Sequence, residues 1–258
     1  MKIVKGARSL TLIPPPLDDF LKGQIEPELS AEGDKAKCER CREFNLEVNH
    51  FPSGKIRVAR ICDGCIDALK EEEEQRKKAY RAANIKEILA RSGVPKRFLS
   101  CTLENFQGYD RLKIKGRPAL ITGPPGTGKT HLGVAYLGQD LVQHRGRHGL
   151  FLEAVELFLK LRDTFSRNAP LDESGILEQY LQVPFLVLDD LGAEKVSDYV
   201  RQTLYLLINN RYGGCLDTII TSNLSLDEIG QNYGDRLASR IAGMGEELIL
   251  NGKDRRLG

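Results

Sequence analysis

Residues 123–130 read GPPGTGKT, and this stretch decides the fold of the 258-residue chain. An apolar run at 119–122 precedes it, and a helix-like stretch at 131–144 follows it. Glycines in such a loop let successive backbone N–H groups, and the N-terminus of the following helix, point at one anion. A glycine-rich turn without a ligand is the alternative reading, but strand, loop and helix occur here in the order that a phosphate-binding P-loop requires. We therefore predict that ATP is bound by Gly123, Pro124, Pro125, Gly126, Thr127, Gly128, Lys129 and Thr130.

Two side chains of this P-loop have distinct predicted tasks. Lys129 would reach the β- and γ-phosphates, because a lysine at this position of the motif extends over the loop. The hydroxyl of Thr130 would hold Mg²⁺ beside the same phosphates. The sequence thus predicts both ATP and Mg²⁺ as ligands.

Two acids directly follow the apolar run 185–188, where a carboxylate can join the Mg²⁺ shell. We assign Asp189 to the metal and Asp190 to the water that attacks the γ-phosphate. The alternative is that this acid pair caps the helix expected at 196–211. Asn223 ends another strand-like run and can donate a hydrogen bond to the γ-phosphate or orient the water, although such an Asn alone is more often a turn residue.

The rest of this region alternates strand-like and helix-like segments, which is the pattern of an α/β fold with a parallel sheet. Each strand-like run is short and apolar, as expected for strands buried on both faces. Ligands of such sheets bind at the carboxyl ends of the strands, where the polar residues above would meet. We predict five strands, at 119–122, 149–152, 185–188, 218–221 and 248–250.

Four cysteines form a separate module upstream. Two CxxC pairs with twenty residues between them match the spacing of a four-cysteine zinc ribbon, so we predict that Zn²⁺ is bound by Cys38, Cys41, Cys62 and Cys65. The alternative is two disulfides or two redox-active CxxC pairs. We disfavour it because the cytosol, where we expect this chain, keeps thiols reduced. A lone His50 is not needed as a ligand. Cys101 and Cys215 stand apart and are predicted to be small buried residues.

Composition and charge argue against a membrane protein, a secreted protein and a strongly basic nucleic-acid-binding protein. No apolar run approaches the roughly 18–20 residues that a transmembrane helix needs, and the N-terminus lacks a signal-peptide pattern, so we expect a cytoplasmic protein without membrane contact. A net charge of +2 gives no overall attraction to nucleic acid. Basic residues near Phe51, at Lys55, Arg57 and Arg60, permit phosphate contact and base stacking, but a solvated basic strand face is the favoured explanation.

Several stretches together resemble a known family. GPPGTGKTHL, LVLDDLGAEK, LYLLINNRY, TIITSNLSLDEI and GDRLASRI look like the AAA+ ATPase domain of the DnaC/DnaI-type bacterial helicase loaders, a family that also includes IstB-type transposition helpers. The match covers roughly residues 92–258. The acids of LDDLG place the chain nearer the loaders, because the transposition helpers tend to have Glu at the second position. The resemblance implies that the Asn223 strand lies between the P-loop strand and the Asp189 strand.

The resemblance also implies three arginine positions. Residues 234–240 correspond to the region that supplies an arginine finger to the neighbouring subunit, with Arg236 as first choice and Arg240 as second. An inserted guanidinium would neutralise charge on the transferring phosphoryl group, so hydrolysis would require a homo-oligomer. Arg240 can instead pair with a local acid such as Asp235 or Glu246. Arg256 occupies the place of a sensor arginine, or belongs to a loose tail.

The expected organisation is a flexible lead-in at 1–37, a zinc ribbon at 38–66, a linker helix at 67–92 and an AAA+ ATPase domain at 93–258. The resemblance implies a nucleotide-switched loader of a hexameric replicative helicase that contacts single-stranded DNA. The zinc ribbon can bind the helicase, single-stranded DNA or another protein. Two rival functions are a transposition helper ATPase and a zinc-ribbon adaptor whose nucleotide-binding core hydrolyses little ATP.

Overall fold

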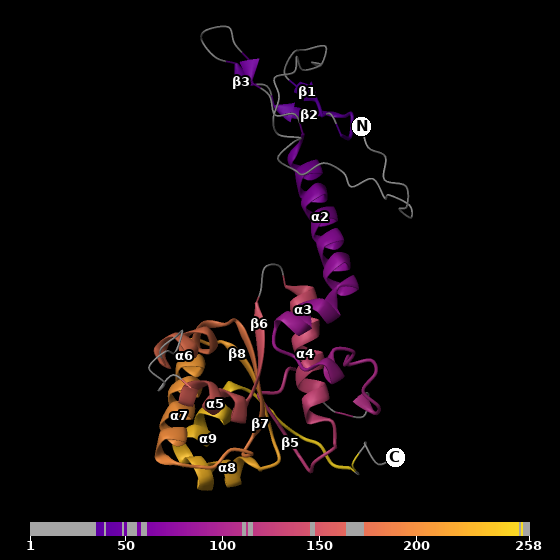
Figure 1. Cartoon of the computed structure of the whole chain (residues 1–258). Coiled ribbons are helices and arrows are strands. Elements are labelled where there is room, and N and C mark those ends of the chain that lie inside the picture. Colours follow the sequence, from indigo (N-terminus) through magenta and orange to yellow (C-terminus); the bar gives the residue numbers. More distant parts are fainter. Residues whose placement is uncertain are drawn as a thin grey trace, which may run out of the picture. The chain divides into compact units, whose positions relative to one another are not determined.

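A computed structural model describes residues 35–38, 40–47, 49–50, 56–57, 61–109, 112, 116–144, 148–163, 173–252 and 254. The chain divides into two compact units, residues 1–77 and 78–258, which are described separately. Figure 1 labels their elements along the sequence. The predicted domain boundaries remain predictions.

The first unit is built from short strands and the start of one helix. Strands β1 (Lys35–Lys37) and β2 (Phe44–Glu47) pair antiparallel, as do β3 (Asn49–His50) and β4 (Ile56–Arg57). Among its described residues, the buried ones form one small cluster of Cys38, Leu46 and Ile61. So small a core supplies little hydrophobic stabilisation, so a cross-link or metal is expected to support it.

Two helices occupy the segment for which the sequence predicted a single linker helix at 67–92. Helix α2 spans Asp63–Ala83, and α3 spans Ile85–Arg91. Asn84 separates them, and its side-chain amide donates a hydrogen bond to the carbonyl oxygen of Tyr80 at 2.8 Å. Asn side chains compete with helical backbone bonds in this way. Helix α3 ends at Arg91, and Gly93 just beyond it adopts a left-handed conformation at φ 90°.

A five-stranded parallel sheet forms the centre of the second unit, which confirms the predicted α/β fold. Its strand order is β6-β7-β8-β5-β9, so β8 lies between β7 and β5 as the resemblance implied. All three residues of β5 are buried, as expected for a strand covered on both faces. The strands are β5 (Leu120–Thr122), β6 (Gly149–Glu153), β7 (Phe185–Leu191), β8 (Asp217–Ser222) and β9 (Glu247–Ile249).

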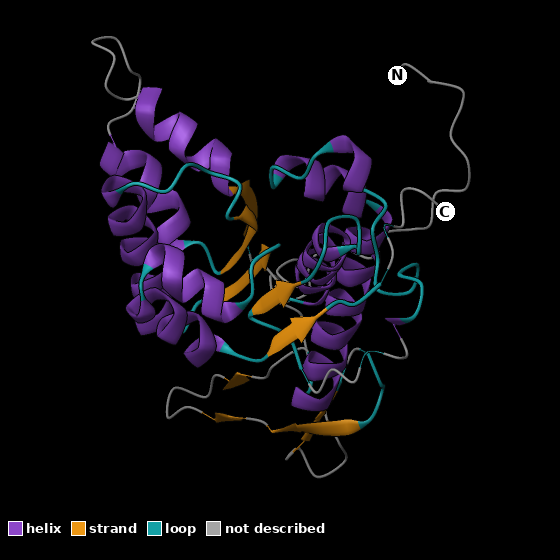
Figure 2. Cartoon of the chain, turned by 90° about the horizontal axis from the view of Figure 1, so that it is seen from below, coloured by secondary structure: helices purple, strands orange, loops and turns teal. Residues whose placement is uncertain are grey.

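Helices cover both faces of this sheet (Figure 2). One apolar cluster joins α3 and α4 (Lys129–Gln143) to the sheet through residues such as Leu89, Leu132 and Leu137, with the short 3-10 helix η1 (Lys96–Phe98) alongside. A second cluster lies on the other face. It includes residues of α5 (Ala154–Asp163), α6 (Glu173–Gln182), α7 (Asp198–Gly213), α8 (Leu226–Tyr233) and α9 (Asp235–Met244).

Side-chain caps set where the helices after β7 and β8 begin. The hydroxyl of Ser197 accepts a hydrogen bond from the Val200 amide at the start of α7. Ser225 and Glu228 form a capping box at the start of α8. Because Ser197 caps α7, the acid pair 189–190 does not, and that alternative is wrong. Among the described helices, each is too short or too polar to cross a membrane.

Candidate nucleotide site and metal centre

The P-loop has a backbone that requires its glycines. Gly123, Gly126 and Gly128 have φ values of 141°, 78° and 100°, where residues with a Cβ are strained. A Cβ on Gly123 would lie 2.2 Å from the carbonyl oxygen of Leu250, and one on Gly128 would lie 2.6 Å from the Phe106 ring. The loop therefore holds its shape between the end of the sheet and an aromatic side chain.

Lys129 begins α4 and is held over the loop. Its ammonium donates to the carbonyl oxygens of Gly123 at 2.7 Å and Pro124 at 2.9 Å, and to Oδ1 of Asn223 at 2.7 Å. The side chain is buried with 7% of its surface exposed. The Thr127 hydroxyl braces the same loop by donating to the Pro124 carbonyl oxygen at 2.9 Å. The structure thus joins two predicted site residues, Lys129 and Asn223, that are far apart in the sequence.

Asp189 is a buried carboxylate beside the predicted magnesium hydroxyl. The Thr130 hydroxyl donates to its Oδ2 at 3.0 Å, and the Thr221 hydroxyl donates to its Oδ1 at 2.6 Å. Burial raises the pKa of Asp189 to about 6, with a smaller contribution from the charges of Asp190 and Glu153, while the two hydroxyl bonds oppose the rise. A divalent cation would favour the ionised form, and the hydroxyl and carboxylate oxygens fit the preference of Mg²⁺.

Asp190 adopts a left-handed conformation at φ 56°, and the pairing of β7 with β8 shifts register between Leu188 and Leu191. Its amide donates to the Thr221 hydroxyl at 2.9 Å. Its Oδ1 accepts a hydrogen bond from the side-chain amide of Asn223 at 3.2 Å. Asn223 therefore bridges Lys129 and Asp190, and the carboxylates of the two acids have different hydrogen-bond partners although the residues are adjacent in sequence.

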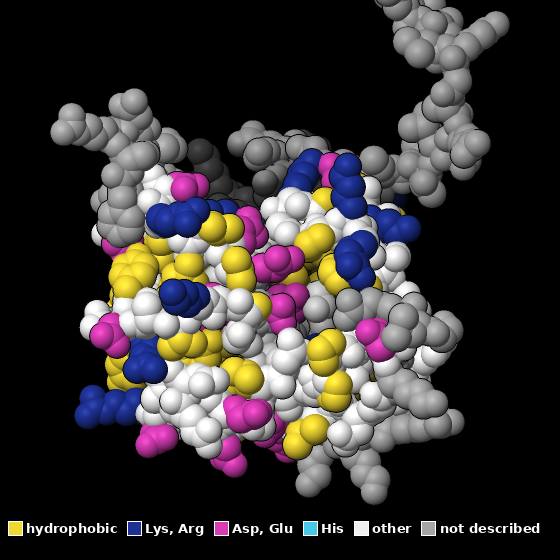
Figure 3. Space-filling view, turned by 60° about the horizontal axis from the view of Figure 1, so that its bottom comes forward, with side chains coloured by type: hydrophobic (Ala, Val, Ile, Leu, Met, Phe, Trp, Pro, Cys, Tyr) yellow, Lys and Arg dark blue, Asp and Glu magenta, His cyan; other side chains and the backbone are white. Residues whose placement is uncertain are grey.

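Figure 3 shows acidic side chains gathered in a hollow near the middle of the face it presents, with basic side chains around them.

The sequence did not single out Asp254, which follows β9 and also contacts the P-loop. A Cβ on Gly126 would lie 1.9 Å from Oδ1 of Asp254, so this carboxylate lies directly against the loop. No motif signals that contact. Arg256, the proposed sensor, lies outside the described residues.

The two candidate finger residues are both on α9, which packs on the face of the sheet opposite to α4. Arg236 is exposed. Arg240 donates from Nε to the side-chain oxygen of Asn209 at 3.0 Å, and its guanidinium lies 4.8 Å from the centre of the Tyr212 ring. The described partners of Arg240 are thus an amide and a ring rather than the acids considered from sequence. Within the described residues, no hydrogen bond or ion pair joins either arginine to the P-loop of its own subunit.

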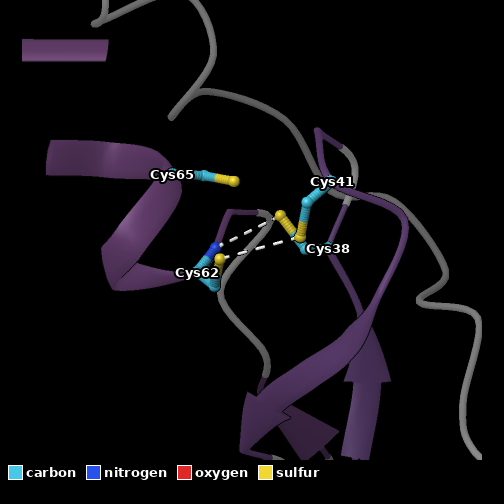
Figure 4. A group of neighbouring side chains, drawn as sticks. All are labelled: Cys38, Cys41, Cys62 and Cys65. Atoms are coloured by element: carbon cyan, nitrogen blue, oxygen red, sulfur yellow. Dashed lines mark hydrogen bonds between the residues drawn. The ribbon is translucent and has the colours of Figure 1, made fainter. Parts of the chain in front are cut away.

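The four cysteines of the first unit converge, as Figure 4 shows. Their sulfur atoms all lie within 4.8 Å of one another, and none is in a disulfide. Burial alone would raise the pKa of Cys38, but backbone N–H groups of residues 40, 41 and 62 lower it to about 6. Desolvation and the neighbouring thiols raise the pKa of Cys65 to about 12. A shared cation is what would let all four sulfurs ionise together, which fits a Zn²⁺ site.

The two other cysteines differ from the prediction that both are buried. Cys101 is half-buried, and Cys215 is exposed in a left-handed turn at φ 50°. The predicted role of the basic residues near position 51 cannot be followed, because Phe51, Lys55 and Arg60 lie outside the described residues, as does the side chain of Arg57.

Comparison with known proteins agrees with this geometry. The chain is 26% identical over 185 residues to the replicative helicase loader DnaC of Buchnera aphidicola subsp. Acyrthosiphon pisum, covering 66% of this chain and 74% of that protein. A crystal structure of the DnaC helicase loader aligns with a TM-score of 0.51 and 28% identity over 61% of this chain and 100% of that chain. A crystal structure of DnaI, with a TM-score of 0.50 and 24% identity over 63% and 94% of the two chains, supports the AAA+ fold alone.

A family model described as IstB-like ATP binding protein matches residues 113–242, which is half of the chain. The matched range contains the P-loop, the acid pair, Asn223 and both arginines of α9. The chain belongs to the IstB-like ATP-binding protein family, with DnaC and DnaI helicase loaders as distant relatives.

Proposed function

We propose that this chain is an oligomeric AAA+ ATPase that loads a hexameric replicative helicase onto single-stranded DNA. The observation that supports it most is the Asn223 side chain, which bonds both Lys129 and Asp190 within a chain that resembles DnaC over two thirds of its length. This arrangement connects the phosphate-binding loop to the acid pair through one amide.

Each side chain of the site has a different role in phosphoryl transfer. Lys129 binds the β- and γ-phosphates, and Asn223 positions the γ-phosphate or the water beside it. Asp190 accepts a proton from that water or orients it. Thr130 and Asp189 would hold Mg²⁺, which when bound neutralises charge on the phosphates. Catalysis is then mostly positioning and charge neutralisation.

Completion of the site would come from a second copy of the chain. Arg236 is exposed on α9, on the opposite face of the sheet from α4. Because Arg240 is held by Asn209 and Tyr212, Arg236 is the stronger candidate for a finger in trans. The ATP state would thereby control how neighbouring subunits associate around the DNA. The Zn²⁺-bound cysteine module would contact the helicase.

The test is a loading assay with the replicative helicase of the native host. Helicase bound to single-stranded DNA circles is measured with wild-type protein, with Lys129→Ala and with Cys215→Ser as a control outside both sites. We expect ATP-dependent loading by wild type and by the control, and none by Lys129→Ala. Wild-type protein that leaves helicase occupancy unchanged would contradict the proposal.

The family match favours a second candidate, an ATPase that assists a transposase on duplex DNA, because the family includes IstB-like proteins. The two functions differ in their DNA. Protein with bound ATP is offered single-stranded and duplex DNA of equal length, and assemblies are counted on each. A strong preference for duplex, together with no loading, would support the transposition helper.

Zinc-dependent helicase binding without measurable ATP turnover would support the third function, a zinc-ribbon adaptor with a nucleotide-binding core.

A further inference from the structure

Thr221 has no assigned role, yet its hydroxyl contacts both acids of the site. It lies on β8 with 1% of its surface exposed. The hydroxyl accepts a hydrogen bond from the Asp190 amide at 2.9 Å and donates one to Oδ1 of Asp189 at 2.6 Å. One hydroxyl therefore joins the two acids of the site.

The chemistry of a hydroxyl fixes the direction of both bonds. A threonine has one proton to donate, and its oxygen can accept at the same time. Because a backbone N–H can only donate, the Thr221 oxygen must accept from Asp190, and its single proton is then available for the Asp189 carboxylate. The bond to Asp189 is therefore one to a charged acceptor, which is among the stronger kinds.

The backbone of Asp190 is in the left-handed conformation, and the Thr221 hydroxyl helps to hold it there. A non-glycine residue in the left-handed region is strained by about 1 kcal/mol or more and needs support from its surroundings. The Thr221 hydroxyl provides such support by accepting a hydrogen bond from the Asp190 amide, while the side-chain amide of Asn223 donates one to the Asp190 carboxylate. Asp189 is meanwhile held between the hydroxyls of Thr130 and Thr221.

We infer that Thr221 is the positioning residue of the ATPase, and that its hydroxyl directs Asp189 toward the magnesium site and Asp190 toward the attacking water. Without the hydroxyl, the Asp189 carboxylate loses one of its two hydroxyl donors and the Asp190 backbone loses its bond. This inference rests on the ATP chemistry of the proposed function, but it does not depend on which client is loaded.

The test compares Thr221→Ser with Thr221→Ala in the full chain. Both variants lose the same methyl group, and they differ only in the hydroxyl. The readouts are the kcat of ATP hydrolysis, the Mg²⁺ concentration that half-saturates ATP binding, ATP affinity without Mg²⁺, and the melting temperature. We expect Thr221→Ala to lower kcat and raise the Mg²⁺ requirement by about tenfold each, and Thr221→Ser to stay close to wild type. ATP affinity without Mg²⁺ should change little in both.

Thr218 provides a matched control at the other end of β8. It is also a buried threonine, and its hydroxyl accepts from Nε of Arg211 at 2.8 Å and donates to the carbonyl oxygen of Leu216 at 3.0 Å. Thr218→Ala should lower the melting temperature relative to Thr218→Ser without changing kcat or the Mg²⁺ requirement. The inference is overturned if Thr221→Ala and Thr221→Ser have the same kcat and the same Mg²⁺ requirement. A failure of the loading function would look different, because wild type would then bind Mg²⁺ and ATP without loading helicase.

Discussion

Arg211 is a fully buried cation at the opposite end of β8 from the nucleotide site. Its guanidinium donates to the Thr218 hydroxyl and to the carbonyl oxygens of Tyr180, Val183 and Asp217, at 2.7 to 2.8 Å. Burial lowers the pKa of Arg211 to about 10, and the Asp217 charge opposes that effect. One side chain thus joins α7 to the end of α6 and to the segments that begin β7 and β8.

Replacing Arg211 by Met should therefore destabilise the second unit. Three carbonyl oxygens, two of them buried, and one buried hydroxyl would lose their donors, at a cost of about 3–5 kcal/mol in the free energy of unfolding. Urea denaturation measures this change. Arg236→Met is the control, because an exposed arginine should change the free energy by less than about 0.5 kcal/mol. Equal midpoints for the two variants would contradict the role given to Arg211.

Asp189 predicts how the stability of the ligand-free protein depends on pH. Its folded pKa of about 6 is above the ordinary value of 3.8, so the folded state binds a proton that the unfolded state has already released. The stability from that proton is present below about pH 4 and is lost as pH rises through 6, by about 2–3 kcal/mol. Urea unfolding from pH 4 to 7.5 should show this loss for wild type relative to Asp189→Asn. Parallel pH profiles would exclude a raised pKa.

Sequence motifs identified Lys129, Asp189 and Asn223 as candidates because each stands at a fixed place relative to a strand. The structure brings them into one site, while their catalytic tasks remain predictions. Arg211 and Thr221 could not be chosen in this way. Arg211 is one of 38 Lys and Arg residues, and its burial depends on carbonyl groups up to 31 residues away. Long-range pairing determines such contacts, and local spacing does not reveal them.

At the scale of elements, β7 shows where local pattern is insufficient. Its apolar run predicts a strand that ends at 188, but the strand continues to Leu191 through the left-handed Asp190. The extension depends on bonds across to β8, including one from the Ser222 hydroxyl to the Leu191 carbonyl oxygen at 2.5 Å. The break between α2 and α3 is likewise set by one side chain, Asn84, within a stretch whose composition favours a continuous helix.

The cysteine module should depend on its metal for folding. The apolar core that its described residues form is small, so Zn²⁺ would supply most of the folding free energy. We expect one Zn²⁺ per chain by elemental analysis, and its removal by a chelator should open residues 38–66 to limited proteolysis while 78–258 stays protected. Cys38→Ser should reproduce the effect, and Cys215→Ser should not. Equal protection of the module with and without chelator would contradict a structural metal.

The whole second unit follows largely from sequence, because alternating strands and helices with one P-loop leave few possible topologies. The resemblance implied the position of β8 between β5 and β7, and the structure confirms it. A single chain cannot show the contacts between subunits, since the finger would act on the site of a neighbour. Arg236 is accordingly placed on an exposed helix by the structure, while its task remains a proposal.

Mixing two inactive variants tests most directly the claim that the ATP site is shared between subunits. Arg236→Ala lacks the proposed finger but keeps the acids, and Asp190→Asn lacks the water-directing acid but keeps its arginine. Each variant alone should lose ATPase activity, by about 10³-fold or more for Arg236→Ala. We predict that an equimolar mixture recovers activity, because intact acids on one subunit then meet an intact arginine on the next. An inactive mixture, or wild-type turnover by Arg236→Ala alone, would contradict a site completed in trans by Arg236.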